Sequence, residues 1–135
     1  MVIQQLKLFF IGLIFMLTID AIWIFLIAKG FYAKQFGTLM RKTGEHPQLA
    51  IVAALLAWTL LVVGIVVLVL PNASSYGTAA MYGAILGFVI YGVYDFTNLA
   101  TITGWTIPMV IVDMLWGTFL CSITSIWIFF MSKII

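Results

Sequence analysis

Four long apolar runs separated by polar connections dominate the pattern of this 135-residue chain. A helix needs about 20 predominantly apolar residues to cross about 30 Å of hydrocarbon, and each run meets that length. The sequence therefore predicts an all-α membrane protein, a four-transmembrane-helix antiparallel bundle that forms a single domain over residues 1–135. The expected spans lie at about Leu8–Ala28, Leu49–Leu70, Thr78–Ala100 and Ile107–Met131.

The first apolar run has a second interpretation, because Lys7 precedes it as a basic residue precedes the apolar part of a signal peptide. The run is too long for that role, no small-residue cleavage site follows it, and Asp20 interrupts it. A transmembrane helix is the favoured interpretation.

The longest hydrophilic connection, Lys29–Gln48, predicts a short amphipathic segment in the headgroup region, where it could roof a pocket. A solvated basic loop is the alternative, because Gly30 and Gly37 weaken a helix. His46 lacks a partner at metal-ligand spacing and is weak evidence for a metal site. In the predicted amphipathic segment, the apolar residues Phe31, Tyr32, Phe36, Leu39 and Met40 alternate with the polar residues Lys34, Gln35 and Arg41.

Small residues indicate where helices approach one another closely. The second run has no ionisable group, and Ala50, Ala53, Ala54, Ala57 and Gly64 suggest a packing scaffold. In the third run, Gly83 and Gly87 are spaced so that a partner backbone can approach. The sequence leaves open whether this partner lies in the same chain or in a second copy, as in a homo-oligomer.

Three aspartates, Asp20, Asp95 and Asp113, lie inside the apolar runs. An aspartate at the centre of a bilayer costs roughly 2.5 to 3.5 kcal/mol to insert, so each is a candidate functional residue. Four antiparallel spans place all three about 8 to 12 Å below the same face, at a rise of 1.5 Å per residue. Their shared depth predicts one carboxylate pocket.

Aromatic and amide side chains accompany these acids at helical spacing. Met16, Asp20, Trp23 and Ile27 should share one stripe of the first helix, and Trp116 lies near Asp113 on the last. The predicted ligand-binding residues are Asp20, Trp23, Tyr91, Tyr94, Asp95, Asn98, Asp113 and Trp116.

Carboxylates gathered in a low-dielectric site cannot all stay ionised without a cation or strong donors. The preferred interpretation is binding or transport of a proton, a metal ion or a small cationic or amphipathic ligand, with Asp20, Asp95 and Asp113 as the ligands of any metal. One alternative is a structural or interaction protein whose acids are hydrogen-bonded. The other is a membrane-embedded enzyme that acts on a lipid, with Asn98 as an oxyanion donor. The sequence assigns no catalytic residue and no cofactor.

Composition and charge restrict the partners. Only 7% of the residues are charged, and no basic run with interleaved aromatics lies outside the apolar segments, so nucleic acid is excluded and the lipid bilayer is the expected partner. Lys29, Lys34, Arg41 and Lys42 outnumber Lys7 and Lys133 on the opposite side. By the positive-inside rule, the Lys29–Gln48 loop is cytoplasmic and both termini lie outside.

Several short motifs together resemble a family of small bacterial membrane proteins known as domain of unknown function 2177. They are Asp20-x-x-Trp23, Tyr94-Asp95-x-Thr97-Asn98-Leu99-Ala100-Thr101, Gly104-Trp105 and Asp113-x-x-Trp116-Gly117. The resemblance implies a four-span fold in the bacterial inner membrane and supplies no activity. The family commonly carries a basic residue before the Gly-Trp pair, where this chain has Thr103.

Overall fold

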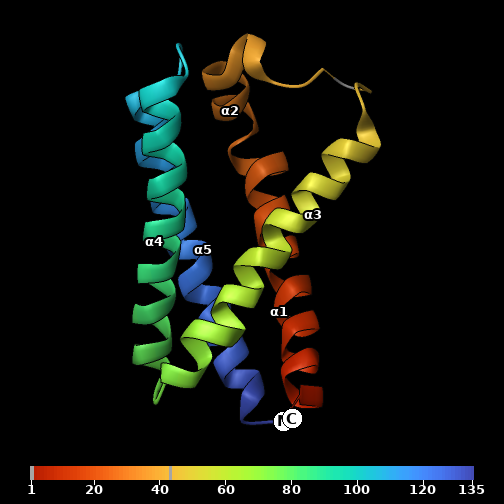
Figure 1. Ribbon diagram of the computed structural model, residues 1–135, viewed down its shortest axis with the longest axis vertical. Helices are drawn as coiled ribbons and strands as arrows, with labels where there is room; N and C mark the ends of the chain where they lie inside the picture. The colour runs from red at the N-terminus through yellow and green to blue at the C-terminus, as the bar shows by residue number, and fades with distance from the viewer. Residues whose placement is uncertain (1, 43) are drawn as a thin grey trace.

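The computed structural model, described over residues 2–42 and 44–135, confirms an all-α membrane protein (Figure 1). It contains four helical spans of 26 residues, each long and apolar enough to cross a bilayer. The first span begins earlier than predicted, at Val2, and the second and third extend one or two residues beyond each predicted limit. The last agrees with its predicted limits to within one residue. The spans are α1 with η1 (Val2–Ile22, Trp23–Ile27), α3 with η3 and η4 (Pro47–Gly64, Ile65–Val69, Leu70–Asn72), α4 (Tyr76–Thr101) and α5 (Ile107–Ser132).

Local signals in the sequence set the starts of the later helices. Pro47 occupies the first turn of α3, where its missing N–H costs nothing. Ser75 and Thr78 form a reciprocal capping box at the start of α4. At the start of α5, the Thr106 hydroxyl accepts a hydrogen bond from the Met109 N–H at 3.3 Å.

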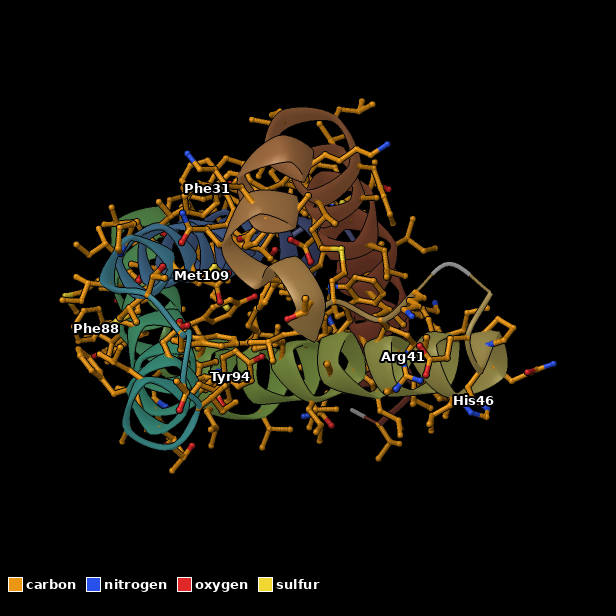
Figure 2. The ribbon with its side chains drawn as sticks, turned by 90° about the horizontal axis from the view of Figure 1, so that it is seen from above. Phe31, Arg41, His46, Phe88, Tyr94 and Met109 are labelled. Atoms are coloured by element: carbon orange, nitrogen blue, oxygen red, sulfur yellow. The ribbon has the colours of Figure 1, made fainter. Side chains whose placement is uncertain are left out.

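The connection after the first span folds into α2 (Lys29–Phe36) and the short turn η2 (Gly37–Leu39). Figure 1 shows α2 at the end of the bundle opposite both termini, and Figure 2 shows it lying above the space between the spans. At the other end, the Gln4 side chain donates to the Ile135 carbonyl at 2.8 Å. The amphipathic segment expected from the sequence is thus a helical cover.

Helices α4 and α5 form the most extensive interface in the protein. Gly83 and Gly87 are buried there, and a Cβ on Gly87 would lie 2.9 Å from the Cβ of Cys121 and closer still to the Gly117 carbonyl oxygen. The partner that these glycines admit is therefore α5 of the same chain. Of the two partners that the sequence leaves open, α5 of the same chain occupies this face.

Helix α3 packs along only part of its length. Leu61, Val62 and Ile65 are buried in the core, whereas the residues from Pro47 to Ala57 are mostly exposed. The expected close packing is therefore wrong for Ala53 and Ala57, which are both exposed. The physical reason is the tilt of α3, which crosses the bundle diagonally and diverges from α4 toward the end that carries α2 (Figure 1).

We expect Gly87→Ala to destabilise the protein by about 1 to 3 kcal/mol, because the added methyl group would overlap the α5 backbone. The measurement is the thermal unfolding midpoint of the purified protein in detergent. Gly77→Ala is the matched control, because it lies on the same helix with only an ordinary contact to Ser75 at 3.7 Å. Equal midpoints for the two variants would show that the α4–α5 interface is looser than described.

Candidate functional site

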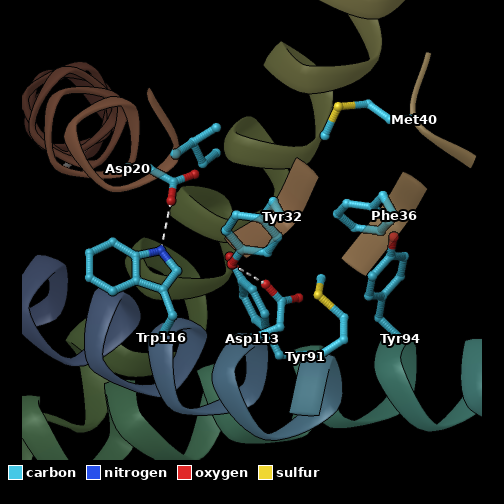
Figure 3. A pocket seen from close by; sticks show the side chains of 10 residues that line it. Asp20, Tyr32, Phe36, Met40, Tyr91, Tyr94, Asp113 and Trp116 are labelled. Atoms are coloured by element: carbon cyan, nitrogen blue, oxygen red, sulfur yellow. Dashed lines mark hydrogen bonds between the residues drawn. The ribbon is translucent and has the colours of Figure 1, made fainter. Parts of the chain in front are cut away.

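A cavity of about 260 Å³ lies beneath α2, between the upper parts of the spans (Figure 3). It receives side chains from α1, α2, α4 and α5, so no single segment of the sequence contains it. Its lining is largely aromatic and apolar, with two carboxylates. The lining residues are Asp20, Ile24, Tyr32, Phe36, Met40, Tyr91, Tyr94, Met109, Asp113 and Trp116.

Asp20, in the last turn of α1, is held by two indole groups. Trp58 Nε1 of α3 donates to Asp20 Oδ2 at 2.7 Å, and Trp116 Nε1 of α5 donates to Asp20 Oδ1 at 2.7 Å. The aspartate is only 5% exposed. A single carboxylate therefore joins three spans through two charge-assisted hydrogen bonds.

Trp23 reaches the site indirectly. Its ring stacks on Trp116 at 4.2 Å between centroids and 7° between planes, and its indole donates to the Tyr32 hydroxyl at 3.1 Å. The turn that begins at Trp23 is a π-helix, in which the Ala28 N–H bonds to the Trp23 carbonyl at 2.7 Å. This wider turn shifts the helical phase and leaves Ile27 exposed, which corrects the predicted stripe through Ile27.

Asp113 is paired with the cover helix. The Tyr32 hydroxyl of α2 donates to Asp113 Oδ1 at 2.8 Å, as Figure 3 shows. Burial, and secondarily the charge of Asp113, raises the pKa of Tyr32, so the phenol keeps its proton and remains a donor. A second contact holds α2 in place, since the Thr106 hydroxyl donates to the Gln35 side chain.

Asp95, on α4, is the most secluded of the three acids. It is 0% exposed, and neither carboxylate oxygen has a hydrogen-bond partner among the described residues. Asp113 and Trp105 are its polar neighbours, and the Trp105 indole N–H is likewise buried without a partner in the described chain. Asp95 is therefore a neighbour of Asp113 but is not among the residues that line the cavity.

The remaining predicted residues divide between the cavity and its surroundings. Tyr91 and Tyr94 line the cavity, and the Tyr91 ring lies against Gly117, where a Cβ would collide with it. Asn98 is half-buried near the end of α4 and is not among the lining residues. Among residues 2–42 and 44–135, no three His, Cys, Asp or Glu side chains form a group that could hold a metal ion.

A second cavity of about 360 Å³ adjoins the first, between α3 and α4. It shares Tyr91, Tyr94 and Asp113 with the cavity beneath α2. The rest of its lining is apolar and consists of Ala57, Leu60, Leu61 and Ile90.

Several residues of the site were not predicted as such. Trp58 was assigned only to a packing helix, although a tryptophan in a transmembrane helix carries an N–H that needs an acceptor, and this signal could have paired it with an aspartate. Tyr32, Phe36 and Met40 were predicted only as part of an amphipathic segment. Their position over the acids depends on how the loop folds back, which periodicity does not encode.

Residues 5–130 match the family model of domain of unknown function 2177, a family described as predicted membrane proteins. The chain therefore belongs to this family. No curated protein and no solved structure shows a significant match to it.

We expect Trp58→Phe to lower the free energy of unfolding by about 1 to 3 kcal/mol, because it leaves one oxygen of a buried carboxylate without its donor. Unfolding in detergent measures the change. Trp127→Phe is the control, since that ring stacks on Phe15 at 5.1 Å and contributes by packing.

A double-mutant cycle isolates the hydrogen bond from the loss of ring volume. In an Asp20→Leu background, Trp58→Phe should cost clearly less than it does in the native chain. An identical cost in both backgrounds would contradict a stabilising bond between these side chains.

Proposed function

We propose that this membrane protein binds a small organic cation in the cavity beneath α2. The observation that carries the proposal is the composition of the cavity lining, which brings Asp20 and Asp113 together with aromatic rings and includes no lysine or arginine. Two carboxylates in a site of low dielectric constant require compensation by positive charge or by donors. Among the described residues, the donors to these carboxylates are neutral and belong to Trp58, Trp116 and Tyr32.

The lining also suits the shape of an organic cation. Asp113 accepts one hydrogen bond from Tyr32, which leaves its second oxygen available to an ammonium group. The faces of Tyr91 and Trp116 can provide cation–π contacts, worth about 2 kcal/mol or more when the site is desolvated. A cavity of about 260 Å³ accommodates such a group together with a short apolar substituent.

A bare metal ion suits the site less well. Mg²⁺ and Ca²⁺ require about six or more oxygen ligands at short distance, whereas only two carboxylates line the cavity and three of their four oxygens already accept hydrogen bonds. An organic ammonium ion needs fewer direct ligands, since aromatic faces share its charge.

One observation favours a structural role for part of the site. Asp20 has two indole donors, so its contribution to holding α1, α3 and α5 together needs no ligand. The same explanation does not cover Asp95, which is buried without a partner in the described chain. We therefore assign Asp20 both a structural and a ligand-facing role.

We further propose that the protein resides in the bacterial inner membrane with the cavity on the cytoplasmic side. The basic residues Lys29, Lys34, Arg41 and Lys42 lie on the connection that contains α2, which supports this orientation. Reporter fusions at the two termini should be active only outside the cytoplasm. Activity of both fusions in the cytoplasm would reverse the orientation.

We expect n-butylammonium to bind the protein in nanodiscs and n-butanol to bind far more weakly, with tryptophan fluorescence as the measurement. Asp113→Asn should weaken n-butylammonium binding roughly tenfold or more, because a hydrogen bond to a charged group contributes about 1.5 to 3 kcal/mol. Glu45→Gln is the control, since it removes an exposed acid far from the cavity lining. Equal affinities for the amine and the alcohol would refute the proposal.

Protons should compete with the cation for the same carboxylates. The ligand is charged throughout the acidic and neutral range, whereas a protonated carboxyl group attracts it less. Binding should therefore weaken as the pH falls and strengthen as it rises. A pH-independent affinity between about pH 4, near the ordinary pKa of a carboxyl group, and about pH 8 would argue against carboxylate recognition.

A further inference from the structure

The apolar cavity between α3 and α4 adjoins the carboxylate cavity, and Tyr91, Tyr94 and Asp113 line both. We propose that it holds the apolar tail of the ligand, so that the ligand is a long-chain amphiphilic cation that enters sideways from the bilayer. The inference rests on the proposed function, since the cationic head would occupy the cavity beneath α2. It adds a tail-binding site and a route of entry.

The position of α3 provides that route. Helix α4 contacts the second span mainly at η3 and η4, near the termini, whereas α3 itself leans away toward the other end (Figure 1). Leu60 of α3 and Ile90 of α4 line the cavity and are also exposed on the surface, at 69% and 39%. The surface of these apolar spans faces hydrocarbon, so the cavity opens to lipid tails and not to water.

The charge at the inner end of the cavity selects the headgroup. Asp113 lies where the two cavities meet, and neither lining contains a lysine or arginine. The phosphate of a zwitterionic phospholipid would be brought close to this carboxylate and repelled by it. A single positively charged head is the headgroup that the lining complements.

The two parts of such a ligand would have different roles. A tail that leaves the bilayer for an apolar cavity gains little, because lipid is as apolar as the cavity wall. The head therefore supplies most of the binding free energy, and the cavity decides which membrane-dissolved molecules can approach it. Enrichment of the tail in this cavity should accordingly depend on the charge of the head.

The test uses dodecylamine that carries a photoreactive diazirine near its terminal carbon, with the corresponding photoreactive dodecanol as the neutral probe. Each is added to the full-length protein in nanodiscs, irradiated, and mapped by mass spectrometry. We expect the amine to label Leu60, Leu61 and Ile90 several-fold more than the alcohol does, relative to the exposed Leu68 and Phe88, which line neither cavity. Asp113→Asn should abolish this preference.

Ala57→Phe should block the cavity and reduce labelling of Leu60, Leu61 and Ile90 by the amine, while n-butylammonium still binds. Ala53→Phe is the matched control, because it lies one turn earlier on α3, is equally exposed and does not line the cavity. Equal labelling by amine and alcohol, or equal effects of the two alanine variants, would overturn the tail site and leave the cation site standing. Failure of n-butylammonium itself to bind would instead overturn the proposed function.

Discussion

The hydrogen bonds from Trp58 and Trp116 to Asp20 are the interaction on which the arrangement of the spans depends. Inside a bilayer no water satisfies polar groups, so a carboxylate must find its donors within the protein. Asp20 finds them on two different helices, and this requirement fixes α3 and α5 relative to α1. If α3 or α5 moved away, an oxygen of Asp20 and the indole N–H of Trp58 or Trp116 would lose their hydrogen bond, so the three spans form one unit.

Close packing of α4 on α5 is the complementary constraint. The glycines at that interface bring the backbones together, and Gly117 also leaves room for the Tyr91 ring to lie flat against α5. Helix α1 packs more extensively against α5 than against α3, and α3 joins the other spans through Asp20 and the core below it. The carboxylate cavity lies between α1, α4 and α5 beneath α2, and the apolar cavity lies where α3 diverges from α4.

The cover helix α2 shields the acids of the cavity on one side and leaves the side toward α3 and α4 as the route to them. Tyr32 closes the upper side of the cavity while it donates to Asp113, and the basic residues of the same connection remain exposed on the outer surface. The acids therefore lie beneath a polar cover on one side and beside an apolar opening on the other. A molecule with a positive head and an apolar tail matches both boundaries, whereas a fully hydrated ion matches neither.

The sequence by itself determined the number of spans, their approximate limits and the candidate acids, because apolar length and the cost of a buried charge are local properties. It left open whether the first connection is an amphipathic cover or a solvated loop. Tertiary structure alone decided which donors Asp20 and Asp113 have, that Asp95 does not line the cavity, and that α5 occupies the glycine face of α4. It also decided that the first half of α3 stands apart from α4. These features depend on the tilt of helices and on a π-helical turn, which arise from contacts between distant segments and leave no periodic signal in the chain.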